Sequence, residues 1–323
     1  MATILGRRTR ENDLPREKYV ELKHVVAVSQ FTRPMIEQLF ASADRMRADN
    51  DLASRLRGRI LATLFYEPST RTRLSFESAM LRLGGQVIAT ENAREFSSAI
   101  KGETVEDTVR IVAGYADAIV IRHYEQGSAE RAAAISSVPI INAGDGPGEH
   151  PTQALLDLYT IRTELGRIDR LKVALVGDLR YGRAARSLAL MLGLTEETEL
   201  IFVAPEAVAM GTDVRTALQQ RGVPFRDEPN LSAALGEADV VYQTRIQQER
   251  FATLGEYDAV RDVYILDESS LRQLRSDAVI LHPLPRVNEI AATVDRDPRA
   301  AYFRQAHNGV FLRMALLDAL IQH

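Results

Sequence analysis

Short apolar runs alternate with amphipathic stretches along almost the whole of this 323-residue chain. Apolar runs of this length predict buried strands, and most of the stretches between them have the residue spacing of helices. We expect strands at residues 60–65, 87–89, 118–121, 139–141, 172–176, 200–204, 240–242 and 279–281. Because strands that alternate with helices form βαβ units, the pattern predicts an α/β protein with mostly parallel sheets.

The segment at residues 142–150 is the predicted domain boundary, because it holds three glycines and a proline between two α/β patterns. A helix predicted at 153–165 would link the domains, and another at 310–321 would pack back on the first domain. The predicted fold has two α/β domains, each a mostly parallel sheet flanked by helices, with an active-site cleft between them. The first domain takes residues 1–150 plus 306–323 and the second takes 151–305. Residues before 20 are polar and predict a flexible lead-in.

The densest polar motif lies at residues 69–73, where three hydroxyls and two guanidiniums follow Pro68. An apolar strand precedes the motif, and a helical pattern at 74–83 follows it. The motif is therefore expected at a strand-to-helix turn, where the first backbone N–H groups of the helix are unpaired and the helix dipole is positive. These donors and fixed positive charges predict a phosphate site. A capped helix with solvated arginines is the plainer alternative.

Other polar residues also stand just past the carboxyl ends of predicted strands. Open α/β sheets bind ligands at this edge, so two facing sheets would form one arginine-rich cleft. The residues are 69–73, Arg122, His123, His150, 178–183, Arg245, Gln247 and 282–286.

The composition of the chain excludes several classes of function. The net charge of −4 argues against a nucleic-acid binder driven by bulk electrostatics. The chain has no cysteine, which excludes disulfides and thiolate metal sites, and His150 has no second histidine at ligand spacing, so we expect no metal. No apolar run approaches the roughly 18 residues that span a bilayer. The first residues show no signal-peptide core, and we expect a cytoplasmic enzyme.

Several motifs leave alternatives open. Residues 176–184 resemble a phosphate loop in glycine spacing, but Arg183 and Ala184 replace its lysine and hydroxyl, so nucleotide binding is disfavoured. His150 is either structural or a hydrogen-bond donor to a substrate carbonyl. The turn at 282–286 is either a stiff surface loop or a rigid site with a cis peptide before Pro285. The loop at 97–103 is either solvated or closes over an anionic ligand through Lys101.

Taken together, these segments resemble the catalytic chains of the aspartate carbamoyltransferase family, from about residue 20 to the end. The first motif marks carbamoyltransferases in general, and the later ones are typical of the aspartate branch. The ornithine branch carries His-Cys-Leu-Pro and Ser-Met-Gly, which this chain lacks. The motifs are at residues 68–73, 101–104, 122–123, 144–146, 150–153, 177–183, 244–247 and 282–286.

The resemblance implies a homotrimer with shared active sites and with no metal or organic cofactor. Larger assemblies with regulatory or other pathway subunits stay open. Its substrates would be carbamoyl phosphate and L-aspartate, bound by different domains. The implied phosphate ligands are Ser69, Thr70, Arg71 and Thr72. Thr72, Arg122 and His150 would contact the carbamoyl oxygen, and Gln153 its amino group. Ser97 and Lys101 would enter from the neighbouring subunit. Arg183, Arg245 and Gln247 would bind the aspartate carboxylates, Lys101 would also reach this substrate, and the backbone at Leu284 would accept from the reacting amine.

The implied reaction transfers the carbamoyl group to the amine of aspartate in pyrimidine biosynthesis. A carbamoyltransferase for ornithine is the first alternative, but Arg245 argues against it because a diamine would require an acidic pocket. A catalytically silent, anion-binding regulatory or scaffold subunit is the second alternative. Loss of a site residue would favour it, but all five are present: Arg71, Lys101, Arg122, His150 and Arg245. A nucleotide-dependent enzyme is the third alternative, and the failed match to the phosphate loop disfavours it.

Overall fold

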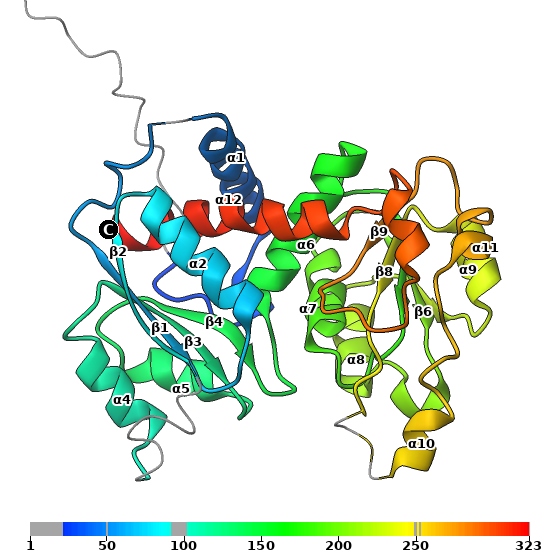
Figure 1. Cartoon of the computed structure of the whole chain (residues 1–323), viewed down its shortest axis with the longest axis horizontal. Coiled ribbons are helices and arrows are strands. Elements are labelled where there is room, and N and C mark those ends of the chain that lie inside the picture. Colours follow the sequence, from blue (N-terminus) through cyan, green and yellow to red (C-terminus); the bar gives the residue numbers. More distant parts are fainter. Residues whose placement is uncertain (1–21, 50, 92–101, 249–250, 252, 323) are drawn as a thin grey trace, which may run out of the picture.

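The computed structural model describes residues 22–49, 51–91, 102–248, 251 and 253–322. Two parallel sheets, each flanked by helices, stand side by side along the long axis of the molecule (Figure 1). We call them the first and the second unit. The predicted α/β class with two parallel-sheet units is therefore confirmed. The lead-in before residue 20 lies outside the described residues.

The first unit holds a four-stranded sheet in the order β2-β1-β3-β4, and every pairing in it is parallel. Buried apolar residues fill its central strands, as expected for strands covered on both faces. Its outer strand β2 is only partly buried, so its apolar pattern is weak and the prediction at 87–89 was too short. The strands are β1 (Ile60–Phe65), β2 (Gln86–Glu91), β3 (Ala118–His123) and β4 (Ile140–Asp145).

The second unit holds a five-stranded parallel sheet in the order β7-β6-β5-β8-β9. Four of its strands lie where the sequence predicted them. The fifth, β7, was missed because it is a short, partly exposed edge strand without an apolar pattern. The strands are β5 (Lys172–Val176), β6 (Glu199–Val203), β7 (Phe225–Asp227), β8 (Val240–Gln243) and β9 (Val279–Leu281).

Helices cover both faces of each sheet, as parallel strands with crossover connections require. In the described residues of the first unit they are α1 (Arg33–Ala48), α2 (Thr70–Arg82), α4 (Val105–Val112) and α5 (Ser128–Ile135). In the second unit they are α7 (Arg183–Leu192), α8 (Thr212–Gln220), α9 (Leu231–Glu237), α10 (Leu254–Asp258) and α11 (Glu268–Leu271). Short 3-10 helices are η1 (Val28–Gln30), η3 (Glu206–Val208) and η5 (Ala292–Arg296).

Two long helices join the units. Helix α6 (Pro151–Leu165) starts one turn past β4, and α12 (Tyr302–Ile321) crosses from the second unit to pack on α1, α2 and α6 (Figure 1). The predicted packing of the last helix on the first unit is confirmed. Helix α12 begins at Tyr302 rather than at residue 310, because its first turns carry buried polar residues that break the apolar pattern. The domain boundaries proposed from the sequence stay a prediction.

One apolar core runs from the first sheet through α6 and α12 to α7 and α8 of the second unit. Smaller clusters fill the opposite face of each sheet. The shared core fixes the two sheets relative to each other, so that the carboxyl ends of their strands face a common space. Within the described ranges, no helix is long and apolar enough to span a membrane.

Candidate active site

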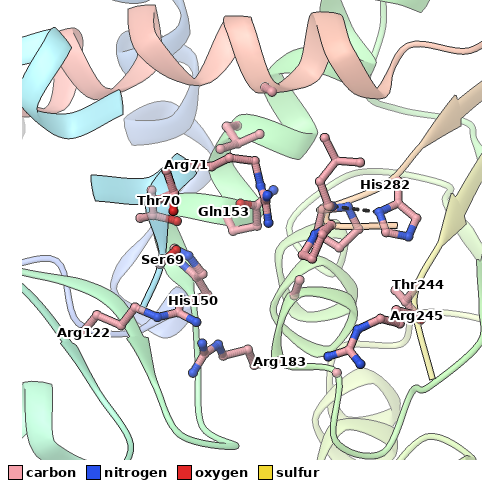
Figure 2. Close-up of a pocket in the computed structure, with 18 of the residues that line it drawn as sticks. Ser69, Thr70, Arg71, Arg122, His150, Gln153, Arg183, Thr244, Arg245 and His282 are labelled. Atoms are coloured by element: carbon pink, nitrogen blue, oxygen red, sulfur yellow. Dashed lines mark hydrogen bonds between the residues drawn. The ribbon is translucent and has the colours of Figure 1, made fainter. Parts of the chain in front are cut away.

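A cavity of about 600 Å³ lies between the two units, at the carboxyl ends of strands from both sheets. Figure 2 shows the labelled side chains entering it from several elements. Eleven of the thirteen residues proposed from the sequence line this cavity: Ser69, Thr70, Arg71, Thr72, Arg122, His150, Gln153, Arg183, Arg245, Gln247 and Leu284. The other two, Ser97 and Lys101, lie outside the described residues.

The N-terminus of α2 forms one wall. Ser69 is the N-cap residue, but its side chain makes no capping hydrogen bond, so its hydroxyl and the first backbone N–H groups of the helix remain available to a ligand. Arg71 lines the cavity, and burial lowers the pKa of its guanidinium. Arg73 instead pairs with Glu91, with 2.9 Å between Nη2 and Oε2. Of the two arginines in this motif, only Arg71 serves the cavity.

A second cluster of positive charge in the cavity contains one arginine from each unit. Arg122 at the end of β3 donates to the carbonyl of Ala143 over 3.2 Å, and Arg183 at the start of α7 donates to that of Gly146 over 2.8 Å. Burial, together with the nearby Arg183, lowers the pKa of Arg122 to about 9. Glu67 Oε2 lies 3.7 Å from Arg122 Nη2 and 3.3 Å from Arg183 Nη2. One carboxylate therefore holds two like charges close together.

Gly144 permits this arrangement. Its φ is +113°, which favours glycine, and a Cβ there would lie 2.8 Å from the guanidinium carbon of Arg183 and 3.2 Å from Arg122 Nη1. Any larger residue would displace at least one of the two guanidiniums.

His150 and Gln153 enter from the first turn of α6. The backbone N–H of His150 donates to Ser187 Oγ over 2.9 Å. Burial, with positive charge from Arg183 and Arg122, lowers the pKa of the His150 imidazole well below its ordinary value. The ring is therefore neutral at neutral pH and can donate one hydrogen bond into the cavity. Gln153 Nε2 donates to Asp157 Oδ1 over 2.8 Å.

The second unit supplies the opposite wall. Arg245 and Gln247 follow β8, and Gln247 Nε2 donates to Asp178 Oδ2 over 3.3 Å. After β9, the Leu284–Pro285 peptide is cis. Of the two alternatives for this turn, the structure therefore has the site with a cis peptide and not the surface loop. The backbone N–H of Leu284 donates to His282 Nδ1 over 2.7 Å, and His282 Nε2 lies 2.8 Å from Glu289 Oε1. The turn is thus fixed at the rim of the cavity.

The polar lining residues that the sequence did not predict are Glu67, Ser75, Gln305 and Arg313. Arg313 and Asp318 are the two charged residues in the apolar stretch at 310–321, and this interruption was the available signal for Arg313. The other three have no signal beyond lying near a motif or at a helix start. Among the described residues, no group of three or more His, Cys, Asp or Glu side chains is placed to hold a metal ion.

The fold is that of a two-domain α/β protein with an arginine-rich cavity between its two parallel-sheet units. The carbamoyl-P binding domain of the aspartate/ornithine carbamoyltransferase family matches residues 23–163, and the Asp/Orn binding domain of the same family matches residues 169–320. The chain belongs to this family.

Within the family, the chain is similar to aspartate carbamoyltransferases. It is 55% identical over 308 residues to the chloroplastic enzyme of Arabidopsis thaliana, covering 94% of this chain and 79% of that protein. The catalytic subunit from Thermofilum pendens is 48% identical over 301 residues, with 93% and 95% covered.

Solved structures agree with this placement. Aspartate transcarbamoylase from Trypanosoma cruzi in complex with N-(phosphonacetyl)-L-aspartic acid is 41% identical, covers 93% of this chain and 96% of its own, and has a TM-score of 0.88. Its complex with carbamoyl phosphate has the same identity, coverage and TM-score. The family and the enzyme class predicted from the sequence are thus confirmed.

Proposed function

We propose that this cavity binds carbamoyl phosphate and L-aspartate and transfers the carbamoyl group between them. The amine nitrogen of aspartate attacks the carbonyl carbon, the bond from that carbon to the bridging oxygen breaks, and inorganic phosphate leaves with N-carbamoyl-L-aspartate as the product. The observation that carries this proposal is the placement of Arg71 from the first unit and Arg245 from the second on one cavity. Two anionic substrates need two such cationic ends.

The phosphate end is the N-terminus of α2. The hydroxyls of Ser69, Thr70 and Thr72 and the guanidinium of Arg71 surround a helix start with unpaired N–H groups. Hydroxyl donors, backbone donors and the helix dipole all favour a dianion at this place. The planar Arg71 guanidinium adds charge-assisted hydrogen bonds to the phosphoryl oxygens.

The carbamoyl oxygen becomes negative as the amine attacks. Thr72, Arg122 and His150 all line the cavity beside the phosphate end, and we assign them to this oxygen. Well-placed donors of this kind contribute roughly 3–4 kcal/mol each to transition-state stabilisation. The neutral His150 ring donates without moving a proton, which suits a group that stabilises charge.

Aspartate binds on the opposite wall. Arg183 and Arg245 match its two carboxylates, Gln247 adds an amide donor, and the carbonyl of Leu284 accepts from the amine. Arginine pairs with carboxylates through two parallel hydrogen bonds, which orients the substrate as well as holding it. Bringing both reactants into one cavity converts a bimolecular reaction into an effectively unimolecular one.

The departing phosphate takes the proton of the amine. Glu67 is the sole acidic residue among the described residues that line the cavity, and it is committed to Arg122 and Arg183. A carboxylate held by two guanidiniums is a poor base. The phosphate, by contrast, gains basicity as its bond to the carbonyl carbon breaks.

The assembly is a further part of the proposal. We assign Ser97 and Lys101 to the cavity of a neighbouring subunit in a homotrimer, on the resemblance alone. Association with regulatory or other pathway subunits stays open. A cytoplasmic location stays a prediction, and the name of the Arabidopsis thaliana relative places that protein in the chloroplast.

The test is the binding of N-(phosphonacetyl)-L-aspartate, which joins a phosphonate and an aspartate in one molecule. Calorimetry on the intact protein should give one site per chain, with Arg71→Gln and Arg245→Gln each weakening binding at least about ten-fold because each removes a charge-assisted contact. Arg73→Gln is the matched control, since Arg73 pairs with Glu91, and it should bind as the wild type does. N-(phosphonacetyl)-L-ornithine should bind far more weakly. No binding of the aspartate compound, or equal binding of both compounds, would overturn the assignment.

A further inference from the structure

A fully buried carboxylate stands directly behind the cavity. Asp157 of α6 accepts from Gln153 Nε2 over 2.8 Å and from Gln305 Nε2 over 2.6 Å, both at Oδ1. Its Oδ2 accepts from the hydroxyl of Tyr242 over 2.6 Å. The donors come from α6, α12 and β8, so one side chain ties the two linking helices to the second sheet behind the cavity.

This contact decides how the amide of Gln153 is turned. A carboxylate accepts hydrogen bonds and offers none when it is ionised, so the NH₂ group of Gln153 must face Asp157. Its carbonyl oxygen Oε1 is then the end left for the cavity, which Gln153 lines (Figure 2). The cavity consequently presents an acceptor at this position, and a donor on the substrate is its complement.

We propose that Asp157 is a positioning residue that turns the Gln153 carbonyl toward the substrate and thereby makes the site select an amino group on the acyl carbon over a methyl group. The inference rests on the proposed function, because it concerns the carbamoyl group of the same substrate. A carbamoyl group offers N–H donors to Oε1, whereas an acetyl group of nearly the same shape offers none and leaves the oxygen unpaired.

The same carboxylate also supports the turn after β9. Gln305 donates from Nε2 to Asp157. The Oε1 atom of Gln305 is therefore turned to accept from the backbone N–H of His282 over 2.9 Å. His282 in turn holds the N–H of Leu284. Asp157 therefore fixes the orientation of two amides that both line the cavity.

The protonation state of Asp157 does not reverse this arrangement. Burial raises the pKa of Asp157 to about 7, and the positive charge of Arg313 opposes the rise. Both amides bond to Oδ1, whereas Oδ2 has only the Tyr242 hydroxyl, which can accept as well as donate. A proton on Oδ2 reverses only the bond to Tyr242.

The experiment compares two stable phosphonates of the same size. Phosphonoacetamide carries the amide NH₂, and 2-oxopropylphosphonate carries a methyl group in its place. Dissociation constants are measured by calorimetry on the wild type, Asp157→Ala and Asp157→Asn. The matched control is Thr160→Val, which removes a buried hydrogen bond between the same two helices one turn away, where Asn308 Nδ2 donates to Thr160 Oγ1 over 3.1 Å. Thermal unfolding checks that each variant folds, and Asp157→Ser replaces Asp157→Ala if the latter does not.

We expect the wild type to prefer the amide by roughly ten-fold or more, the value of one hydrogen bond to a group that is otherwise left unpaired. Asp157→Ala should lose most of this preference through weaker binding of the amide, while binding of the methyl compound changes little. Asp157→Asn can keep the Oδ1 contacts and should restore the preference, and Thr160→Val should retain it. A folded Asp157→Ala with the wild-type preference would overturn the inference, as would a wild type that binds both compounds equally. A folded wild type that binds neither compound would instead overturn the proposed function.

Discussion

The carboxylate of Glu67 lies 3.3 Å from Nη2 of Arg183 and ties the loop after β1 to the start of α7. The two residues belong to different units, and the pair lies on the cavity that both units form. Arg183 also donates to the carbonyl of Gly146 over 2.8 Å. Glu67 therefore orients a guanidinium that we assign to aspartate.

Loss of the Glu67 carboxylate should weaken the binding of aspartate more than the binding of carbamoyl phosphate. Glu67→Gln is expected to raise the KM for aspartate several-fold, because Arg183 loses the partner that orients it and repels Arg122 more strongly. The KM for carbamoyl phosphate should change less. Glu77→Gln is the matched control, because it makes the same change on α2, where Glu77 pairs with Arg73 away from the cavity. A Glu67→Gln enzyme with unchanged aspartate kinetics would show that the pair does not serve substrate binding.

His150 should act on the chemical step. His150→Ala is expected to lower kcat by about ten- to a thousand-fold, because its hydrogen bond strengthens as the carbamoyl oxygen becomes negative. Steady-state kinetics with both substrates varied separates kcat from the two KM values. An effect confined to the KM for aspartate would show that His150 does not contact the developing oxyanion.

The lowered pKa of His150 predicts how the stability of the protein changes with pH. The imidazole pKa is 6.5 in the unfolded chain and well below that in the folded protein. Below pH 6.5 the unfolded chain binds a proton that the folded chain does not, so this group costs stability as the pH falls. The penalty grows by up to about 1.4 kcal/mol per pH unit.

His150→Gln should therefore gain stability relative to the wild type as the pH is lowered from 7.5 to 5.5. Groups such as His282, whose pKa is also lowered, and Asp157, whose pKa is raised, are common to both proteins and cancel in the difference. Urea unfolding of both proteins at the two pH values measures this difference in the free energy of unfolding. A difference that does not change with pH would mean that the folded ring takes up its proton normally.

Subunit mixing tests the shared site. If Lys101 serves the cavity of a neighbouring chain, Lys101→Ala and Arg122→Ala should each be nearly inactive alone. After equal mixing, dissociation and reassembly, about one site in four should combine an intact Arg122 with an intact Lys101 from the adjacent chain. If Lys101 serves its own chain, every mixed site keeps one lesion. Activity that stays absent after verified exchange would exclude sharing and weigh against the trimer.

Much of this architecture could be predicted because the informative residues are local in sequence. The strand of residues 60–65 and the polar motif after it predict both an element and its chemistry, and β1 and α2 lie there. The edge strand β7 could not be predicted, because its residues pair only once β6 is in place. Asp157 was likewise missed. Its role depends on Tyr242 and Gln305, which are distant in sequence and meet it only in the folded chain.

Arg245 was identified from its place after a predicted strand, and it makes substrate choice the sharpest test of the whole account. The intact protein is incubated with carbamoyl phosphate and equal amounts of L-aspartate and L-ornithine, and both carbamoylated products are quantified by mass spectrometry. N-carbamoyl-L-aspartate should form with stoichiometric phosphate and with essentially no citrulline. Arg245→Ala should lose aspartate turnover mainly through KM, because a carboxylate partner is removed. Equal carbamoylation of ornithine, or no product from either amine, would contradict the account.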